Sequence, residues 1–261
     1  MKHFSVIGSP IKHSLSPILH QEIYKQLDIS ASYDKKEVSR NKLDTLVNTN
    51  KLNGYNVTLP HKQTILPFLK SLDSSAKIIG AVNCVYKGKG YNTDWIGFLE
   101  SINNYDLSLN NKDCLIIGAG GVARAIAYGL IKKGIKSISI KNRSIEAEKD
   151  LLDWINTLHP TNSLNKNPTI IINCTPLGMW PKINSMPDLE INDQITLIET
   201  VYNPFETKWL KYGKEIGAKT VNGLEMFIYQ GIASIELWMG EKISEKIELE
   251  KVKKVLKSEL C

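Results

Sequence analysis

The sequence has few of the residues that mark a metal-binding, secreted or membrane protein. Its 4 cysteines and 5 histidines are scattered over 261 residues, without a Cys-x-x-Cys pair or ligand spacing among the histidines. We therefore expect reduced thiols in a cytoplasmic protein and no bound metal. The most apolar stretch, residues 115–131, contains Arg124 and several glycines, which argues against a membrane span. The first residues lack the apolar core of a signal peptide.

Charge of one sign is not concentrated in any segment. The formal net charge is +6, and such a balance can indicate a nucleic acid or an anionic ligand. The basic run near the C-terminus is, however, interleaved with acidic residues: Lys251, Lys253, Lys254 and Lys257 alternate with Glu248, Glu250 and Glu259. This mixture is typical of the solvated face of a helix, so we expect neither a nucleic-acid nor a membrane partner.

Strand-like and helix-like segments alternate along the chain, which predicts an α/β fold. A length of 261 residues suits two modest domains, and the pattern starts again after a polar break at residues 110–113. We expect an N-terminal α/β domain at residues 1–103, a second α/β domain at 104–222, and C-terminal helices at 223–261. Because two isolated helices bury little core, these should pack back on the first domain.

Short apolar runs give the expected strands: 4–7, 52–57, 81–86, 114–117, 137–141, 169–173, 196–200 and 219–221. Helices are expected to begin at Pro17, with Ser16 as the N-cap, and at Pro60. Asp94 precedes another helical pattern and is a possible cap for it.

A glycine loop follows the expected strand 114–117. Gly118-x-Gly120-x-x-Ala123, placed between a strand and a helix, is the dinucleotide-binding fingerprint with alanine at its third position. Gly118 permits a tight turn, and Gly120 lets the backbone approach a pyrophosphate at the helix N-terminus. This segment predicts a Rossmann-type domain at 104–222. The alternative is a structural turn in a domain that binds no nucleotide.

The end of the next strand indicates which dinucleotide is bound. Enzymes that use NAD place an acidic residue there, which holds the ribose 2′-hydroxyl. This chain has Lys141-Asn142-Arg143-Ser144 instead. A guanidinium binds a 2′-phosphate that a carboxylate would repel, so the charge predicts NADP. The alternative for Arg143 is a solvated loop cation.

Three loops in the first domain are rich in small polar groups. Ser14 and Ser16 stand just before a helix start, where free N–H groups favour an anion such as a substrate carboxylate. Lys62 falls in the first turn of a helix, where a cation opposes the helix dipole. Asp94 ends the third loop, Gly90–Asp94. The simpler readings are that Ser16 and Asp94 only cap helices and that Ser14 is an ordinary loop residue.

These segments resemble the signature motifs of the shikimate dehydrogenase family. The motifs occur in the family's order from residue 8 to residue 231: GSPIKHSLSP, GYNVTLPHK, GAVNC, GYNTD, GAGGVARA, NRS, INCTPLGM, VYNP and NGLEMFIYQG. The resemblance implies a substrate domain at 1–103 and reversible reduction of 3-dehydroshikimate to shikimate by NADPH. Two positions depart from the usual pattern: Cys84 stands where threonine is common, and Ala147 where a second basic residue is frequent.

The resemblance also implies roles for individual residues. Lys62 and Asp94 would be the catalytic pair, and Ser14 and Ser16 would hold the substrate carboxylate. The ring and its hydroxyls would be positioned by Thr58, Asn83, Tyr202 and Gln230. The cofactor would be lined by Gly118, Ala119, Gly120, Gly121, Val122, Asn142, Arg143, Ser144, Thr200 and Gly223. No metal is required, because the ammonium of Lys62 takes the place of a Lewis acid.

Three alternatives remain open at the level of sequence. A quinate/shikimate dehydrogenase that uses NAD would carry an acidic residue where this chain has Arg143. A non-catalytic ligand sensor on the same fold would have lost Lys62 or Asp94. A folate-linked dehydrogenase would not explain the paired serines. The expected partners are the small-molecule substrate and, at most, a second copy of the chain, as a monomer or homodimer.

Overall fold

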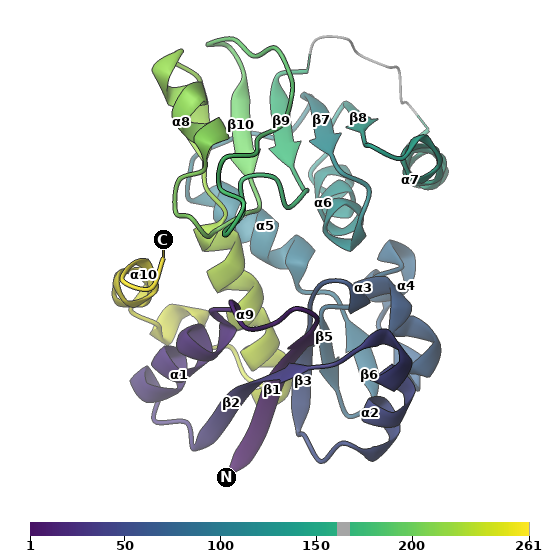
Figure 1. The fold of residues 1–261 in the computed structure, drawn as a ribbon, viewed down its shortest axis with the longest axis vertical. Helices are drawn as coiled ribbons and strands as arrows, with labels where there is room; N and C mark the ends of the chain where they lie inside the picture. The colour runs from purple at the N-terminus through teal and green to yellow at the C-terminus, as the bar shows by residue number, and fades with distance from the viewer. Residues whose placement is uncertain (161–167, 261) are drawn as a thin grey trace. The chain divides into compact units, whose positions relative to one another are not determined.

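The chain forms two compact units in the computed structural model, which describes residues 1–160 and 168–260. The first unit comprises Met1–Gly97 and Ile228–Glu259, and the second comprises Phe98–Phe227. The chain leaves the first unit within helix α5 (Asp94–Asn103) and re-enters it within helix α9 (Leu224–Met239) (Figure 1).

The first unit is built on a six-stranded sheet in the order β2-β1-β3-β5-β6-β4. Its strands are β1 (Lys2–Gly8), β2 (Ala31–Glu37), β3 (Gly54–Val57), β4 (Ser71–Leu72), β5 (Cys84–Tyr86) and β6 (Lys89–Tyr91). Its helices are α1 (Ser16–Gln26), α2 (Leu43–Thr49), α3 (His61–Thr64), α4 (Ser74–Ile79) and α10 (Leu249–Lys257), with 3-10 turns at Arg40–Lys42, Leu66–Phe68 and Ser244–Lys246.

Strand direction brings separate loops to one edge of this sheet. β1 and β3 are parallel, so the loops after Gly8 and Val57 leave the sheet at the same edge. β5 runs antiparallel to β3, with Cys84 opposite Asn56, so the residues just before β5 lie at this edge too. β6 is antiparallel to β5, and its last residue, Tyr91, is opposite Cys84. Residues 9–16, 58–62, 83 and 92–94 therefore converge at one edge.

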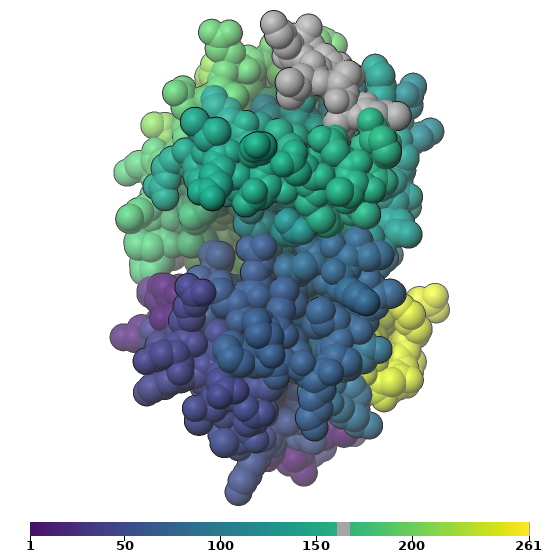
Figure 2. Space-filling model, turned by 90° about the vertical axis from the view of Figure 1, so that its right-hand side faces the viewer, coloured from purple at the N-terminus to yellow at the C-terminus, as the bar shows by residue number. Residues whose placement is uncertain are grey.

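The C-terminal helices complete the core of the first unit. Trp238 of α9 stacks on Phe4 of β1 with ring centroids 4.4 Å apart, and its indole N–H donates to Val85 O at 3.3 Å. α10 packs on α1 and buries Val252 and Leu256. The other side of this C-terminal helix lies on the surface of the molecule, as the yellow atoms of Figure 2 show. Burial of these large apolar side chains provides the hydrophobic stabilisation that holds residues 228–259 on this unit.

Two expected helix starts are wrong by one residue, because α3 begins at His61 with Pro60 as its flanking residue, and α1 begins before Pro17. Helix α1 begins at Ser16, with Leu15 as the flanking residue, and the side chain of the flanking position makes no cap bond. Ser16 is thus inside the first turn, and Pro17 occupies the next position, where its missing N–H costs no helical hydrogen bond.

The second unit is a parallel five-stranded sheet in the order β11-β10-β9-β7-β8 (Figure 1). Its strands are β7 (Asp113–Ile117), β8 (Ser137–Lys141), β9 (Ile170–Asn173), β10 (Thr196–Glu199) and β11 (Lys219–Val221), and its helices α6 (Gly121–Lys132), α7 (Ile145–Leu158) and α8 (Lys208–Glu215). The strand order reverses between β7 and β9, which is where ligands bind in sheets of this type. The sheet has the Rossmann-like architecture expected from the glycine loop.

The strands of the second unit are buried on both faces, as a parallel sheet covered by helices requires. Leu197, Trp209 and Leu210 are each at most 2% exposed where α8 packs on the sheet.

Cys84, Cys114 and Cys174 are free thiols, and Cys261 lies outside the described residues. Within the described ranges, no helix is long and apolar enough to cross a membrane, and no three acidic, histidine or cysteine side chains are grouped to hold a metal.

Candidate active site

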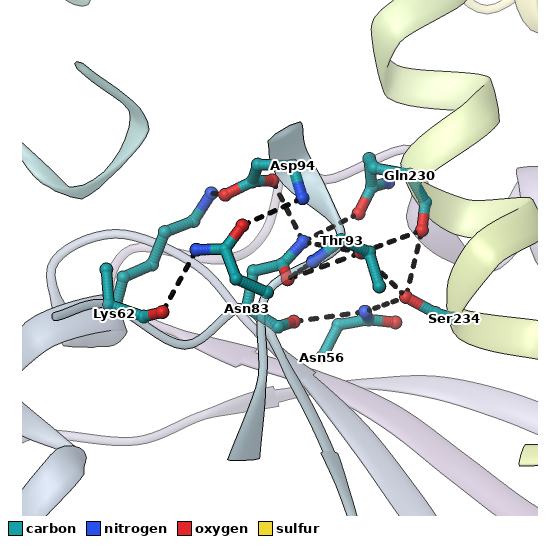
Figure 3. Close-up of polar contacts among 9 residues, drawn as sticks. Asn56, Lys62, Asn83, Thr93, Asp94, Gln230 and Ser234 are labelled. Atoms are coloured by element: carbon teal, nitrogen blue, oxygen red, sulfur yellow. Dashed lines mark hydrogen bonds and ion pairs between the residues drawn. The ribbon is translucent and has the colours of Figure 1, made fainter. Parts of the chain in front are cut away.

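Lys62 and Asp94 form a partly buried ion pair at the convergent edge of the first sheet. Lys62 Nζ lies 2.6 Å from Asp94 Oδ2, and the two side chains are 13% and 5% exposed (Figure 3). Such low exposure removes much of the solvent screening that weakens surface ion pairs. Lys62 is the second residue of the one-turn helix α3, so this cation is held by a carboxylate from another loop rather than by its own helix.

Asp94 does more than begin a helix. It is the first residue of α5, and its second carboxylate oxygen, Oδ1, accepts a hydrogen bond from Asn83 Nδ2 at 2.9 Å. Both oxygens therefore accept bonds from side chains outside the helix. This geometry is that of a carboxylate that orients an ammonium group, and the capping reading does not account for it.

The amide of Asn83 has one orientation in this network. Its Oδ1 accepts from Thr93 N at 2.6 Å, so its Nδ2 faces the acceptors on the other side. Those acceptors are Asp94 Oδ1, Thr93 Oγ1 and Gln230 Oε1, at 2.9, 2.9 and 3.2 Å. Asn83 is thus in direct contact with two other residues expected from sequence, Asp94 and Gln230.

Three further side chains belong to this network, although the sequence analysis assigned them no role. Thr93 Oγ1 lies 3.0 Å from Gln230 O and 3.2 Å from Ser234 Oγ. Asn56 Nδ2 donates to Ser234 Oγ at 2.9 Å and to Asn83 O at 3.1 Å (Figure 3). Thr93 precedes Asp94, which was a signal for its involvement, whereas nothing in the sequence around Ser234 marks that position.

The two serines expected to bind a carboxylate lie next to each other. Ser14 Oγ is 3.1 Å from Ser16 Oγ and 3.3 Å from Ser16 N, at the start of the 11-residue helix α1. Two hydroxyls and the N–H groups of a helix start are a suitable set of donors for an anion. Thr58 follows β3 at the same edge, and a Cβ added to Gly8 would lie 2.6 Å from its methyl group, which places Thr58 against the loop after β1.

The glycine loop of the second unit has the shape that a phosphate requires. Gly118 has φ +108°, and a Cβ there would meet Cys174 O at 3.1 Å. Gly120 has an extended backbone and open space where its Cβ would project, with nothing within 4 Å. Gly118 is therefore fixed by the turn, while the space beside Gly120 is left for a ligand against the N-terminus of α6.

The loop after β8 presents an exposed cation, and its first residue is held by a carboxylate. Arg143 is exposed, and Ser144 caps α7 by accepting from Ala147 N at 3.3 Å. Glu148 Oε2 accepts from Asn142 N at 2.8 Å, which fixes the start of the loop. Asn142, Arg143 and Ser144 lie at the same carboxyl edge of the parallel sheet as Gly118, because β7 and β8 are neighbours.

The remaining expected residues follow β10 or precede α9. Thr200 Oγ1 donates to Asn173 O at 2.8 Å. A Cβ on Gly223 would lie 2.6 Å from Val201 O, so only glycine fits this close approach. Tyr202 stacks on Phe227 with centroids 4.0 Å apart. Tyr202 belongs to the second unit, unlike the other expected substrate residues.

A buried carboxyl group at the end of β10 in the second unit was missed by the sequence analysis. Glu199 is 1% exposed and accepts from Asn173 Nδ2 at 3.0 Å, Val201 N at 3.1 Å and Thr207 Oγ1 at 3.3 Å. Burial raises the pKa of Glu199 to about 8, although these hydrogen bonds favour the charged form. Its bonds connect the loops after β9 and β10, which carry Thr200 and Tyr202.

Three segments of the chain match family models of the same enzyme. Residues 6–85 match the shikimate dehydrogenase substrate binding domain, residues 100–175 match shikimate / quinate 5-dehydrogenase, and residues 223–256 match the shikimate 5'-dehydrogenase C-terminal domain.

Relatives of known name align with nearly the whole chain. The shikimate dehydrogenase (NADP(+)) of Methanococcus maripaludis is 40% identical over 260 residues, which cover 92% of each chain. A solved shikimate dehydrogenase in complex with NADP+ has a TM-score of 0.91 and 33% identity, covering 100% of this chain and 96% of its own. The Thermus thermophilus enzyme, solved with NADP(H) and shikimate, has a TM-score of 0.86 and 27% identity, covering 100% of both chains.

Proposed function

The chain belongs to the shikimate dehydrogenase family, and from this membership and the site we propose that it reversibly reduces 3-dehydroshikimate to shikimate with NADPH. The observation that carries the proposal is the ion pair between Lys62 and Asp94, 2.6 Å apart and largely shielded from water. A surface lysine and a simple helix cap would have no reason to be joined in this way.

We assign the proton-transfer step to Lys62. The oxygen of a ketone gains negative charge as it is reduced, and the ammonium at Nζ stabilises that charge and donates a proton to it. In the oxidative direction the same atom takes the proton back. Asp94 holds the ammonium in place through Oδ2 and, with its remaining acceptor capacity, binds a substrate hydroxyl.

Substrate anchoring is assigned to the other polar groups of the site. The hydroxyls of Ser14 and Ser16 would bind the carboxylate of the substrate, next to the N-terminus of α1. Thr58, Asn83 and Gln230 would position the ring and its hydroxyls. Asn83 and Gln230 are already joined to Asp94 through hydrogen bonds, which supports this assignment. Tyr202 is assigned to the ring through its family motif alone.

Cofactor binding is assigned to the second unit. NADPH, when bound, supplies the hydride that reduces the ketone. The open space at Gly120 and the N–H groups of residues 118–122 fit a pyrophosphate. Asn142, Arg143 and Ser144 would hold the 2′-phosphate, and Thr200 and Gly223 would contribute backbone and hydroxyl contacts. This unit would thus serve as the NADP-binding domain.

We also propose that the protein acts in the cytoplasm, as a monomer or homodimer, with small molecules as its partners. The solved relatives that hold NADP(H) and shikimate support the small-molecule partners.

The test is a spectrophotometric assay of the purified protein with shikimate and NADP. We expect reduced nicotinamide to form with NADP and more slowly with NAD. Quinate replaces shikimate in a parallel series, which separates the proposed activity from that of a quinate dehydrogenase that uses NAD. The Lys62→Ala variant measures the background. A folded wild-type protein that does not oxidise shikimate with either cofactor would contradict the proposal.

A further inference from the structure

Ser234 lies behind the catalytic pair and is not itself part of it. It is fully buried on α9, one helical turn after Gln230, so both side chains lie on the same face of the helix. A hydroxyl inside an apolar helix has a cost unless its hydrogen bonds are made. At this position it contacts side chains from two other segments, Asn56 and Thr93, and those segments carry the rest of the site.

The contacts of Ser234 account for its donor and acceptor capacity. Its Oγ accepts from Asn56 Nδ2 at 2.9 Å, and it has one proton to donate. Gln230 O, at 2.9 Å, is an acceptor for that proton, and the contact with Thr93 Oγ1, at 3.2 Å, can have either hydroxyl as its donor. One hydroxyl therefore connects α9 to β3 and to the loop before α5.

Thr93 transmits this contact to Asp94. Thr93 is also fully buried, and its N–H fixes the amide of Asn83, whose Nδ2 then faces Asp94 Oδ1 at 2.9 Å. The other oxygen of Asp94 holds Lys62. A continuous series of bonds thus runs from Ser234 through Thr93 and Asn83 to the ammonium group (Figure 3).

We propose that Ser234 is a positioning residue for the Lys62–Asp94 pair, acting through the hydroxyl of Thr93 and the amide of Asn83. The inference rests on the proposed function. It assigns to α9 a part in catalysis in addition to the role of Gln230 in positioning the substrate. Loss of the hydroxyl leaves Asn56 Nδ2 with one acceptor and gives Thr93 and Asn83 freedom to turn, so that Asp94 holds Lys62 less well.

The experiment compares Ser234→Ala with Ser5→Ala. Ser5 is a matched control because it is 2% exposed, lies in the same unit and has a hydroxyl without a hydrogen-bond partner among the described residues. Wild-type turnover is measured first. If the wild type does not turn over, the result contradicts the proposed function, on which the inference about Ser234 rests. We expect Ser234→Ala to lower kcat roughly three- to tenfold, with KM for shikimate within about twofold. Ser5→Ala should keep both constants.

Two additional variants separate positioning from general stability. Ser234→Thr retains the hydroxyl and should restore most of kcat. In an Asp94→Asn background, Ser234→Ala should have less than about a twofold further effect, because groups that act as a unit are not additive. An active wild type with unchanged kcat in Ser234→Ala, or effects that multiply in the double variant, would overturn the inference.

A structural readout does not depend on activity. The Thr93 amide, which donates to Asn83 Oδ1 at 2.6 Å, should exchange its hydrogen faster in Ser234→Ala than in Ser5→Ala. If Ser234→Ala does not fold, Ser234→Cys, which is of similar size and a weaker hydrogen-bonding group, carries the same comparison. Equal rates of hydrogen exchange at the Thr93 amide in Ser234→Ala and Ser5→Ala would also count against the proposal.

Discussion

The two units carry their candidate site residues in different states. In the first unit, Asp94 and Asn83 are buried and the Lys62 side chain is 13% exposed. Asp94 is already bonded to both of the others, so their geometry is set before a substrate arrives. In the second unit, the loop at Gly120 borders open space and Arg143 is exposed. Its groups are backbone N–H donors and an exposed guanidinium, for which we propose the cofactor as the partner.

This difference predicts whether a substitution should change the reaction rate or the affinity for the cofactor. Reaction rate depends on groups held in a fixed orientation toward charge that develops in the transition state. Cofactor affinity depends on contacts made in the ground and transition states alike. Changes in the first unit's ion pair should therefore reduce kcat, and changes in the second unit should weaken cofactor binding.

Replacement of Lys62 should have the largest effect. We expect Lys62→Ala to lower kcat by roughly 10²–10⁴, the range for a positioned acid–base group, with a smaller change in KM. Steady-state kinetics measure both, and Lys77→Ala, at an exposed position of α4, is the matched control. A Lys62→Ala enzyme with most of its kcat would end the proposed mechanism.

Asp94→Asn tests the other member of the ion pair. It keeps the shape of the side chain and removes the charge, so turnover should fall, while the double variant should be barely worse than Lys62→Ala alone. Asp73 is the control because its carboxylate does cap a helix, accepting from Ala76 N at 2.8 Å. Asp73→Asn should keep kcat, since asparagine caps about as well as aspartate.

The paired serines should show the opposite kinetic pattern. Ser14→Ala with Ser16→Ala should raise KM for shikimate at least tenfold, because each bond to a charged group contributes about 1.5–3 kcal/mol. The value of kcat should change less, since the carboxylate is bound in both states. Ser9→Ala, in the same loop, is the control. An unchanged KM in the double variant contradicts the carboxylate assignment.

Arg143 tests the cofactor side of the comparison. Arg143→Ala should raise the Kd for NADPH by about tenfold and leave that for NADH nearly unchanged, because only NADPH has the 2′-phosphate. Fluorescence titration of the two reduced cofactors measures this, with Arg40→Ala, another exposed arginine, as the control. Equal weakening of both cofactors would mean that Arg143 contacts a group they share.

Two glycines of one loop should separate cofactor binding from stability. At Gly120 a methyl group projects into open space from an extended backbone, so Gly120→Ala should fold normally and bind cofactor more weakly. At Gly118, φ is +108°, so Gly118→Ala should lower the free energy of unfolding by about 1–3 kcal/mol. Thermal melts and cofactor titrations of both variants check this. Similar melting temperatures would show that the turn tolerates a side chain.

The last test concerns two buried groups that respond to pH in opposite directions. Glu199 in the second unit has its pKa raised to about 8 by burial, so the folded state holds a proton that the unfolded state has lost. Stability should fall as pH rises from about 4.5 to 8, by at most about 1.4 kcal/mol per pH unit. Glu199→Gln should flatten this fall in denaturant titrations.

His20 in the first unit provides the counterpart. Burial lowers the pKa of His20 to about 3, so below its ordinary value of 6.5 the unfolded state binds a proton that the folded state does not. Stability should fall as pH decreases from about 6.5 to 3, and His20→Gln should reduce that fall. If neither variant changes the pH profile, burial does not perturb these groups as described.

The second unit was the easier one to predict from sequence. β9 begins with three consecutive isoleucines, and the expected strands 137–141 and 219–221 have the bounds that the structure shows. β2 in the first unit received no prediction, because in Ala31–Glu37 only Tyr33 is buried and the strand lies at the sheet edge. The domain borders were expected near residues 103 and 222, whereas the change of unit occurs inside α5 and α9, where no local signal marks it.

The sequence by itself determined the chemistry available to this protein: a glycine loop between strand and helix, an arginine where an acidic residue would select NAD, and the residue types of the family motifs. Each of these lies in a window of a few residues, where backbone propensity and side-chain chemistry act locally. Only the tertiary structure decided that Ser234 meets Asn56, 178 positions away, and that Gln230 meets Asn83, 147 positions away. Such contacts depend on the order and direction of the strands and on the packing of α9, which bring distant residues to one edge of the sheet.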